Sequence, residues 1–357
     1  MLEEFDFHID VVSTCNLKCP SCPVGNFGVK PQSHIMQPDL LEAILVKATK
    51  EAQINTVSLF NWTEPLIHPK ITKLIKVVNS FGLKCNISTN LSLKKNVDWS
   101  ELLKSDPHQI RISVSGFSDL TYSKTHRKGN IVRVKENMKQ LAKDREATDC
   151  ATNICVVYIR HLGNLDDEIL MKKYSENLGF SFAPCWAFMM PLEKALTYVS
   201  ETDPLANITK EDEDTIQNLA LPLLDAFKIS SKYKSRACRL QSHQMALTAN
   251  GEVSICCALY DNKYLLGSYL SKSLNEIQDE KMSSDICDRC LAAGGHVYVA
   301  YGAEEFDRLA AQNIVNYYSK HAVNLNVSNE GAWRKGLVMA KKSFNMVRMR
   351  LGLRTRT

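Results

Sequence analysis

The sequence lacks any run approaching the ~18 consecutive apolar residues that a membrane-spanning helix needs. Its opening residues, MLEEFDFHIDVV, are acidic where a secretory signal peptide is basic, and their apolar run is short and broken. Low-complexity segments and internal repeats are also absent. These absences exclude a membrane-embedded or fibrous class, and we expect a globular protein of the cytoplasm.

What is present fits that class. The chain has 357 residues, of which 45% are hydrophobic and 23% are charged. This length is enough for one large domain and a smaller one. Twelve cysteines in a cytoplasmic chain of this size indicate metal or redox chemistry rather than a disulfide framework.

Strand-like and helical segments alternate along the first half of the chain. Six short runs rich in Val, Ile, Phe and Ser/Thr predict strands at 5–12, 55–60, 84–89, 109–115, 153–159 and 179–184. Segments with apolar residues at three- and four-residue steps predict helices at 38–53, 69–82, 130–143 and 165–179. Six βα steps imply an α/β fold whose parallel sheet curls into a partial, TIM-like (β/α)6 barrel, with its site at the carboxyl ends of the strands.

The rest of the chain divides differently. We expect the barrel over 1–190, a helical linker over 191–235, a small α+β domain over 236–295 and a helical C-terminal segment over 296–357. Within the third part, Asn250 and Gly251 between two alternating runs predict a β-hairpin.

Three cysteines follow the first strand in the stretch STCNLKCPSCPVG, at C-x3-C-x2-C spacing: Cys15, Cys19 and Cys22. Three thiolates on one loop can hold three irons of a [4Fe-4S] cube and leave the fourth iron open for another ligand. A structural zinc site is the alternative, but such sites are closed by four ligands, and the next Cys or His is His34.

The triplet and the segments after the next three strands, NWTEPLIHP, ISTN and RISVSG, resemble the radical S-adenosylmethionine (radical SAM) superfamily. The resemblance implies that the open iron binds SAM, with Glu64 on the amine and Arg127 on the carboxylate. Trp62 and Thr63 replace the small residues usual before that Glu, and Ser21 replaces a usual aromatic residue. The SAM contacts that the resemblance implies are Thr63, Glu64, Ser88, Asn90, Ser113, Ser115 and Arg127.

A second set of cysteines lies around the predicted hairpin, at C-x17-C-x30-C-x2-C spacing: Cys238, Cys256, Cys287 and Cys290. Four thiolates satisfy either zinc or an iron-sulfur cluster. The spacing resembles the twitch domain, a shortened SPASM domain, and implies one auxiliary [4Fe-4S] cluster. Cys257 adjoins Cys256; because neighbouring strand residues face opposite sides, we expect only one of the two to be a ligand, and the family spacing favours Cys256.

The resemblance implies an enzyme in which a 5′-deoxyadenosyl radical abstracts hydrogen from a substrate, with an external flavodoxin- or ferredoxin-type electron donor. We expect oxidation of a sugar, aminocyclitol or similar small molecule. The alternatives are epimerisation with Cys257 as hydrogen donor, peptide modification, and a non-catalytic zinc scaffold. Cys185, at the end of the sixth predicted strand, is a further candidate to face the substrate.

The C-terminal tail is strongly basic. From Ala332 onward it holds eight Lys and Arg residues and no acid, although the whole chain carries only +5. Apolar residues at three- and four-residue steps predict an amphipathic helix here. Such a helix either docks on the barrel or associates weakly with an anionic membrane surface or a phosphate-bearing substrate. Nothing in the chain resembles an RNA-binding module, so we expect no nucleic-acid partner.

Overall fold

A sheet of nine strands organises the computed structural model, which describes residues 3–27, 33–94, 97–199, 203–205 and 208–321. The strands lie in the order β6-β5-β4-β3-β2-β1-β7-β8-β9. Their bounds are β1 (Glu4–Ile9), β2 (Gln53–Ser58), β3 (Lys84–Thr89), β4 (Gln109–Val114), β5 (Asn153–Arg160), β6 (Ser181–Trp186), β7 (Gln244–Leu247), β8 (Glu252–Ser254) and β9 (Leu265–Ser268).

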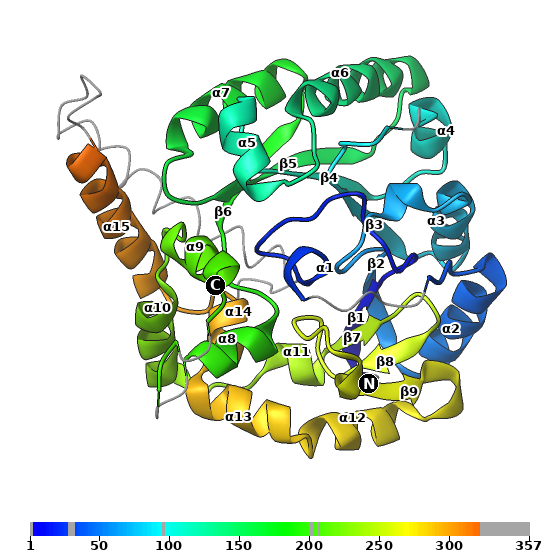
Figure 1. Ribbon diagram of the computed structural model, residues 1–357. Helices are drawn as coiled ribbons and strands as arrows, with labels where there is room; N and C mark the ends of the chain where they lie inside the picture. The colour runs from blue at the N-terminus through cyan, green and yellow to red at the C-terminus, as the bar shows by residue number, and fades with distance from the viewer. Residues whose placement is uncertain (1–2, 28–32, 95–96, 200–202, 206–207, 322–357) are drawn as a thin grey trace.

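The first six strands are parallel, and each pairs with the next along the chain. Figure 1 shows them as a curved wall with helices on its outer side, so the predicted partial barrel is confirmed. The helices of this half are α1 (Pro23–Asn26), α2 (Pro38–Glu51), α3 (Ile71–Ser80), α4 (Trp99–Lys104), α5 (Asp119–Thr125), α6 (Ile131–Thr148) and α7 (Leu165–Asn177). The four longest of these match the predicted helices, whereas α4 and α5, with six and seven residues, were not predicted.

Local sequence signals explain these helices. α2 begins with Pro38 at its first position, where the missing N–H is not needed, and buries Leu41, Ile44, Leu45 and Ala48 along one face. Asn130 caps the N-terminus of α6, and its side chain accepts a hydrogen bond from the backbone N–H of Arg133.

The predicted hairpin is present as β7 and β8, which pair antiparallel. Gly251 in its turn has φ +80°, a conformation that glycine adopts without strain. β7 also pairs parallel with β1, so the hairpin extends the barrel sheet instead of standing apart from it (Figure 1). The carboxyl end of β7 therefore lies beside the carboxyl end of β1, which leads into the cysteine loop.

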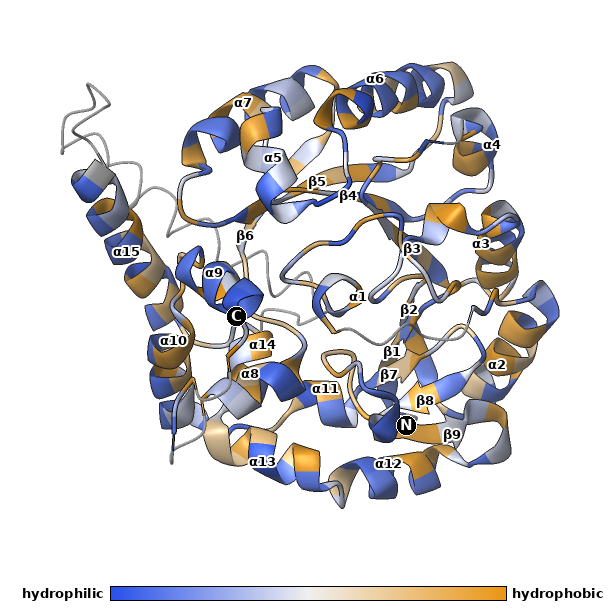
Figure 2. Ribbon diagram, in the orientation of Figure 1, coloured by the Kyte–Doolittle hydropathy of each residue, from blue (hydrophilic) through white to orange (hydrophobic). Residues whose placement is uncertain are grey.

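The later helices are α8 (Leu192–Tyr198), α9 (Lys210–Gln217), α10 (Leu223–Ser230), α11 (Arg239–Ser242), α12 (Leu274–Met282), α13 (Asp285–Ala293), α14 (Gly295–Val299) and α15 (Glu305–His321). The apolar side chains form two buried clusters. One joins β1–β5 to α2, α3, α4 and α6, and the other joins β6 to α8, α10, α14 and α15. Figure 2 shows the strands largely hydrophobic and the helices hydrophilic along parts of their surface. The domain boundaries expected near 190, 235 and 295 stay predictions.

No helix within the described residues is long and apolar enough to cross a bilayer. The basic amphipathic helix predicted from Ala332 onward lies outside the described residues.

Candidate active site and cysteine centres

The cysteine triplet lies on the loop between β1 and α1, in the middle of the barrel mouth (Figure 1). Cys22 caps α1, and its backbone N–H donates to the carbonyl of Cys19 at 3.1 Å. Burial, with smaller contributions from Glu64 and the Cys22 thiol, raises the pKa of the Cys15 thiol to about 12, and burial raises that of Cys22 to about 11. Buried thiols that interact in this way lose their protons when a metal binds.

Gly25 lets this loop close on itself. A Cβ at this position would lie 2.1 Å from the carbonyl oxygen of Cys19, closer than any non-bonded contact allows. The backbone N–H of Gly25 donates to the carbonyl of Cys22 at 2.8 Å. The glycine therefore holds the second and third cysteines on one tight turn.

Asp10, at the end of β1, organises the loop that follows β2. Its buried carboxylate accepts hydrogen bonds from the backbone N–H groups of Asn61 (3.0 Å), Trp62 (3.1 Å) and Thr63 (3.0 Å). It also accepts from the Thr63 hydroxyl at 2.6 Å. The hydroxyl of Thr63, a residue predicted to contact SAM, thus points to Asp10. Burial raises the pKa of Asp10, and these hydrogen bonds oppose that rise.

Glu64 is buried at 1% exposure directly after this loop. Its carboxylate accepts hydrogen bonds from the backbone N–H of Asn90 at 2.8 Å and of Leu66 at 3.1 Å. Burial raises its pKa to about 7, although the bonds from Asn90, Thr89 and Leu66 lower it. No cationic side chain forms an ion pair with Glu64 in the described part of the chain. A ligand cation would provide the missing charge.

Asn90 connects this carboxylate to the cysteine loop. Its side-chain N–H donates to the side-chain oxygen Oδ1 of Asn16 at 3.0 Å and approaches the Cys15 sulfur at 3.7 Å. Its own side-chain oxygen Oδ1 accepts from the backbone N–H of Ser92 at 2.8 Å. Ser88, two residues earlier on β3, is half-buried. The structure brings Glu64, Asn90 and Cys15 together.

The fourth strand places its two serines differently. Ser113 is half-buried on β4. Ser115 is fully buried, and its hydroxyl is bonded to Thr125 and, at 2.8 Å, to Nδ1 of His126. Burial lowers the pKa of His126 to about 4, so this imidazole is neutral. The Ser115 hydroxyl is therefore hydrogen-bonded to residues of the barrel itself.

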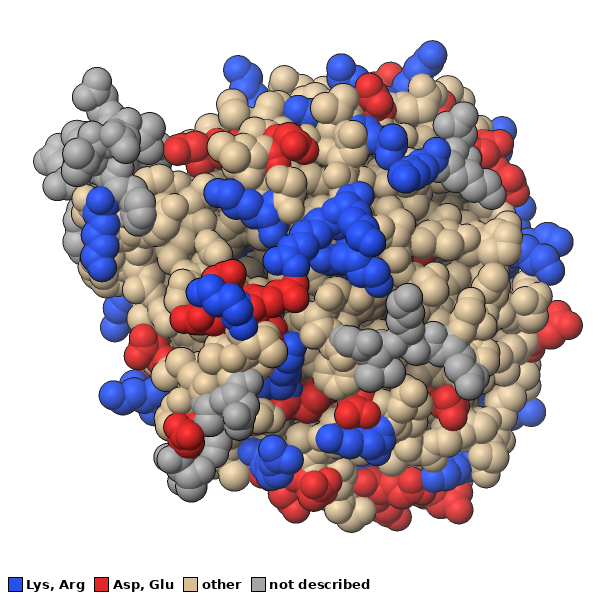
Figure 3. All heavy atoms as spheres, viewed as in Figure 1, with Lys and Arg blue, Asp and Glu red and all other residues tan. Residues whose placement is uncertain are grey.

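Arg127 lies at the rim and forms an ion pair with Glu211 of α9. Both side chains are more than two-fifths exposed, so this pair contributes little stability and can open. Figure 3 shows Lys and Arg side chains gathered over the middle of the barrel face, beside acidic side chains over α9.

The second set of cysteines comes together from three segments, because Cys287 and Cys290 both lie on α13. Cys238, Cys256, Cys287 and Cys290 line one cavity with about 410 Å³ of empty space, walled by apolar residues. Burial, with a smaller contribution from Cys256, raises the pKa of Cys238 and of Cys287 to about 11. No three Cys, His, Asp or Glu side chains converge on a single-ion site within the described ranges. The argument for a metal centre here is therefore that four cysteine sulfurs line the same cavity.

The expectation that Cys257 faces away from Cys256 across a strand needs correction. β8 ends at Ser254, so both cysteines lie in the following turn, where side chains do not alternate. The Cys257 side chain is hydrogen-bonded to Cys256, and its carbonyl accepts from the Asn61 side chain at 3.1 Å. Cys256 lines the cysteine cavity, and Cys257 is absent from the described linings of both that cavity and the larger one below.

Cys185 is buried at 3% exposure on β6, within the second apolar cluster. Its neighbours across the strands include Ile159 of β5. This environment suits packing, and the predicted role facing a substrate stays a prediction.

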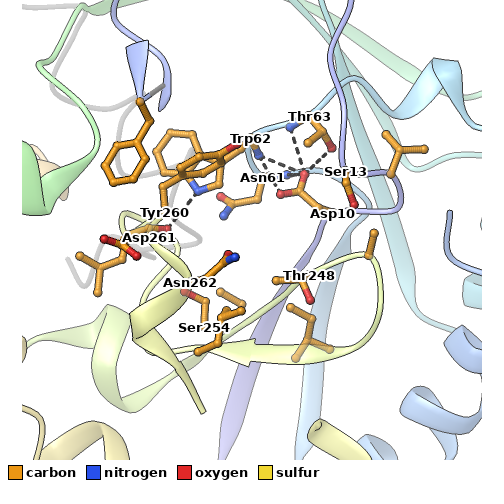
Figure 4. Close-up of a pocket in the computed structure, with 17 residues that line it drawn as sticks. Asp10, Ser13, Asn61, Trp62, Thr63, Thr248, Ser254, Tyr260, Asp261 and Asn262 are labelled. Carbon is orange, nitrogen blue, oxygen red and sulfur yellow. Dashed lines mark hydrogen bonds between the residues drawn. The ribbon is translucent and has the colours of Figure 1, made fainter. Parts of the chain in front are cut away.

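A larger cavity, with about 870 Å³ of empty space, lies between the cysteine loop and the hairpin (Figure 4). Tyr260 packs edge-on against Phe27 and Trp62, with ring centres 5.4 and 6.3 Å apart. The only charged residues in its described lining are Asp10 and Asp261.

The larger cavity adjoins both cysteine centres. On one side, the Cys22 thiol lies 4.0 Å from the carbonyl of the lining residue Trp62. On the other, Ser254 of the lining donates its hydroxyl to the Cys256 carbonyl at 3.0 Å. Leu259 lines both this cavity and the cavity of the second cysteine set. A molecule bound here would lie between the two centres.

His161 follows β5 and was not predicted as a site residue. It lines another hollow, of about 510 Å³, together with Ser21 and Arg127. Its Nδ1 lies 2.9 Å from the Leu162 carbonyl, so Nδ1 donates and Nε2 is an acceptor. Nε2 is buried without a hydrogen-bond partner in the described structure, and burial lowers the pKa of this histidine. The one sequence signal that could have identified His161 as a site residue is its position directly after a strand.

Comparison with known proteins identifies the chain. The radical SAM superfamily profile matches residues 9–164, and the profile of the SPASM iron-sulfur cluster-binding domain matches residues 238–291. The chain belongs to the radical SAM superfamily and carries a C-terminal SPASM-type domain. Its cofactors are a [4Fe-4S] cluster with SAM and an auxiliary [4Fe-4S] cluster.

Solved structures share this fold at low identity. Streptococcus suis SuiB bound to the precursor peptide SuiA is 16% identical with a TM-score of 0.55, covering 83% of this chain and 67% of SuiB. The enzyme anSMEcpe with bound AdoMet is 15% identical with a TM-score of 0.53, covering 93% of this chain and 98% of its own. A search of curated proteins finds no match.

Proposed function

We propose that this radical SAM enzyme oxidises a sugar, an aminocyclitol or a similar polar, ring-shaped small molecule. The observation that carries the proposal is the aromatic-walled cavity between the two cysteine centres. Phe27, Trp62 and Tyr260 offer apolar ring faces, and the two carboxylates of the described lining disfavour an anionic ligand. A polyol or amino sugar has an apolar face and donors that suit these walls.

We assign the cofactor contacts as follows. When bound, the first cluster supplies the electron that cleaves SAM into methionine and a 5′-deoxyadenosyl radical. Cys15, Cys19 and Cys22 would hold that cluster, and an external flavodoxin- or ferredoxin-type protein would reduce it. The auxiliary cluster would be held by Cys238, Cys256, Cys287 and Cys290.

The polar residues of the barrel mouth would bind SAM. The buried carboxylate of Glu64 would accept a hydrogen bond from the SAM amine, and Asp10 would hold the loop that presents it. Arg127, once its exposed pair with Glu211 opens, would bind the SAM carboxylate. The free Nε2 of His161 would accept a hydrogen bond from the adenine amine, since it is a neutral acceptor in the hollow beside Ser21. Thr63, Ser88, Asn90, Ser113 and Ser115 stay predictions; the hydroxyls of Thr63 and Ser115 already have partners.

Oxidation is favoured over epimerisation. An epimerase needs a hydrogen donor facing the substrate, and the Cys257 thiol is bonded to Cys256 instead. Its position supports an outcome in which the substrate loses a second electron to the auxiliary cluster. Cys185, buried in the second apolar cluster, offers no clear alternative donor.

Peptide modification is the second candidate. SuiB was solved with the precursor peptide SuiA, and anSMEcpe with the Cp18Cys peptide. In this chain, the larger cavity would take a side chain of such a peptide.

An anaerobic activity assay separates these candidates. The reconstituted enzyme is supplied with SAM and a reductant, and 5′-deoxyadenosine is measured against neutral sugars, aminocyclitols, sugar phosphates and peptides in deuterated buffer. We expect faster 5′-deoxyadenosine formation with a neutral or cationic cyclic substrate, and an oxidised product. Turnover with peptides alone would support the second candidate. Deuterium incorporated at an inverted carbon would indicate an epimerase.

A further inference from the structure

Lys281 is a lysine buried in the SPASM-type domain. It lies in α12 at 1% exposure. Its ammonium donates to the backbone carbonyl of Gln244 at 2.8 Å and approaches that of Leu240 at 3.4 Å. Lys281 forms no ion pair with a carboxylate in the part of the chain that the structure describes.

The acids on its own helix are engaged or turned away. Glu280 pairs with Lys272 at 2.6 Å, and Glu276 accepts hydrogen bonds from Ser273 in a capping box. Asp279 is exposed on the opposite side of the helix. The negative charge that this buried ammonium needs must therefore come from another element.

The cysteines of the second set lie on that side. Burial lowers the pKa of Lys281, and thiolates at Cys256, Cys238, Cys287 and Cys257 would oppose that lowering. Contacts link the lysine to their cavity: Gln241, which lines the cavity, donates its side-chain N–H to the Lys281 carbonyl at 3.4 Å. α13, which carries Cys287 and Cys290, begins four residues after Lys281.

A buried ammonium with only carbonyl partners is costly, because burial removes the hydration of a full charge. A [4Fe-4S] cluster held by four thiolates is an anion, and each added electron makes it more negative. A cation close to such a cluster stabilises the reduced form more than the oxidised form. The attraction between the lysine and the cluster would thus offset the free-energy cost of burying each charge.

We propose that Lys281 is the buried counter-charge of the auxiliary cluster and holds its reduction potential at a higher value. A higher potential makes the cluster a better acceptor for the electron that substrate oxidation releases. Lys281 is a positioning residue in this sense, since it acts on the electron acceptor and touches no substrate. The inference rests on the auxiliary cluster of the proposed function and is independent of the substrate.

The test measures the potential of the auxiliary cluster alone. In a full-length protein with Cys15, Cys19 and Cys22 all changed to Ala, only the second set of cysteines can hold a cluster. Lys281→Met, Lys281→Gln and Lys281→Arg are made in this background, reconstituted, checked for iron, and titrated by EPR-monitored reduction. Lys272→Met is the matched control, because it removes a partly exposed lysine of the same region.

We expect both neutral variants to disfavour reduction at least tenfold, which is about 59 mV for one electron. Lys281→Arg and Lys272→Met should keep the parent potential. If neither neutral variant assembles a cluster while the folded Lys281→Arg protein does, the charge is required for assembly, which also supports the proposal. A neutral variant with about four irons per chain and the parent potential would overturn it. Iron content and potential are read without any substrate, so failure of the substrate proposal is a separate result.

Discussion

Glu64 offers the sharpest prediction about SAM binding. We expect Glu64→Gln to weaken the affinity for SAM and to remove its dependence on pH near neutrality. In the ligand-free structure the carboxyl is buried with a pKa of about 7. The ammonium of SAM favours the ionised carboxylate, so binding below that pKa must expel a proton from Glu64.

The magnitudes follow from this scheme. A hydrogen bond between a carboxylate and an ammonium contributes about 1.5 to 3 kcal/mol, or roughly ten- to a hundred-fold in affinity. Wild-type affinity should rise by up to about tenfold per pH unit below pH 7 and level off above it. The stability of the ligand-free fold changes with pH in the opposite direction to the affinity for SAM. A carboxyl whose pKa is raised by folding stabilises the ligand-free fold at low pH, and this contribution is lost as the pH rises through about 7.

Calorimetric titration of SAM into the anaerobic, reconstituted enzyme tests this prediction. The useful range lies between about pH 5.5 and pH 7.5, because an α-amino group itself titrates near 7.7 to 8.0. Buffers of different ionisation enthalpy report the released proton. Glu101→Gln, which changes an exposed carboxylate of the same barrel, is the control. Wild-type affinity and an unchanged pH profile in Glu64→Gln would refute the role of Glu64.

Three further predictions concern the loops around the site. Gly25→Ala should lose about four irons per chain, because its Cβ would meet the Cys19 carbonyl oxygen at 2.1 Å; a full iron content would contradict this. Asp10→Ala should lower the free energy of unfolding by about 2 to 6 kcal/mol, as four donors lose their acceptor, and denaturant titration showing no change would argue against it. Cys257→Ala should keep both clusters and form the same oxidised product, measured by mass spectrometry in deuterated buffer. Loss of the distal iron in this variant would make Cys257 a cluster ligand.

Local and regularly spaced signals in the sequence were sufficient to predict the barrel. The run at 84–89 is β3 itself, and the Asn250-Gly251 turn joins β7 to β8. The two cysteine spacings point to the segments that the structure brings together. The strand, the turn and the first cysteine triplet could be predicted because each depends on residues close to one another in sequence, whereas the second cysteine set was predicted from the resemblance of its spacing to a known domain.

The rest depends on contacts between distant segments. Asp10 has no partner near it in sequence; it meets residues 61–63 only because β1 pairs with β2. The pairing of β7 with β1, which places the larger cavity between the two centres, has no local signal either. The alternation argument for Cys257 failed because β8 ends two residues before Cys256, and no residue pattern marks that end.

The most direct test of the central claim compares the wild type with Cys22→Ala and Cys287→Ala after anaerobic reconstitution. Iron per chain and 5′-deoxyadenosine formation are measured together. We predict about eight irons and SAM cleavage in the wild type, and about four irons in each variant. Only Cys22→Ala should lose cleavage of SAM in the absence of substrate. Formation of 5′-deoxyadenosine by Cys22→Ala at the wild-type rate would contradict the assignment of the radical centre to this cysteine loop.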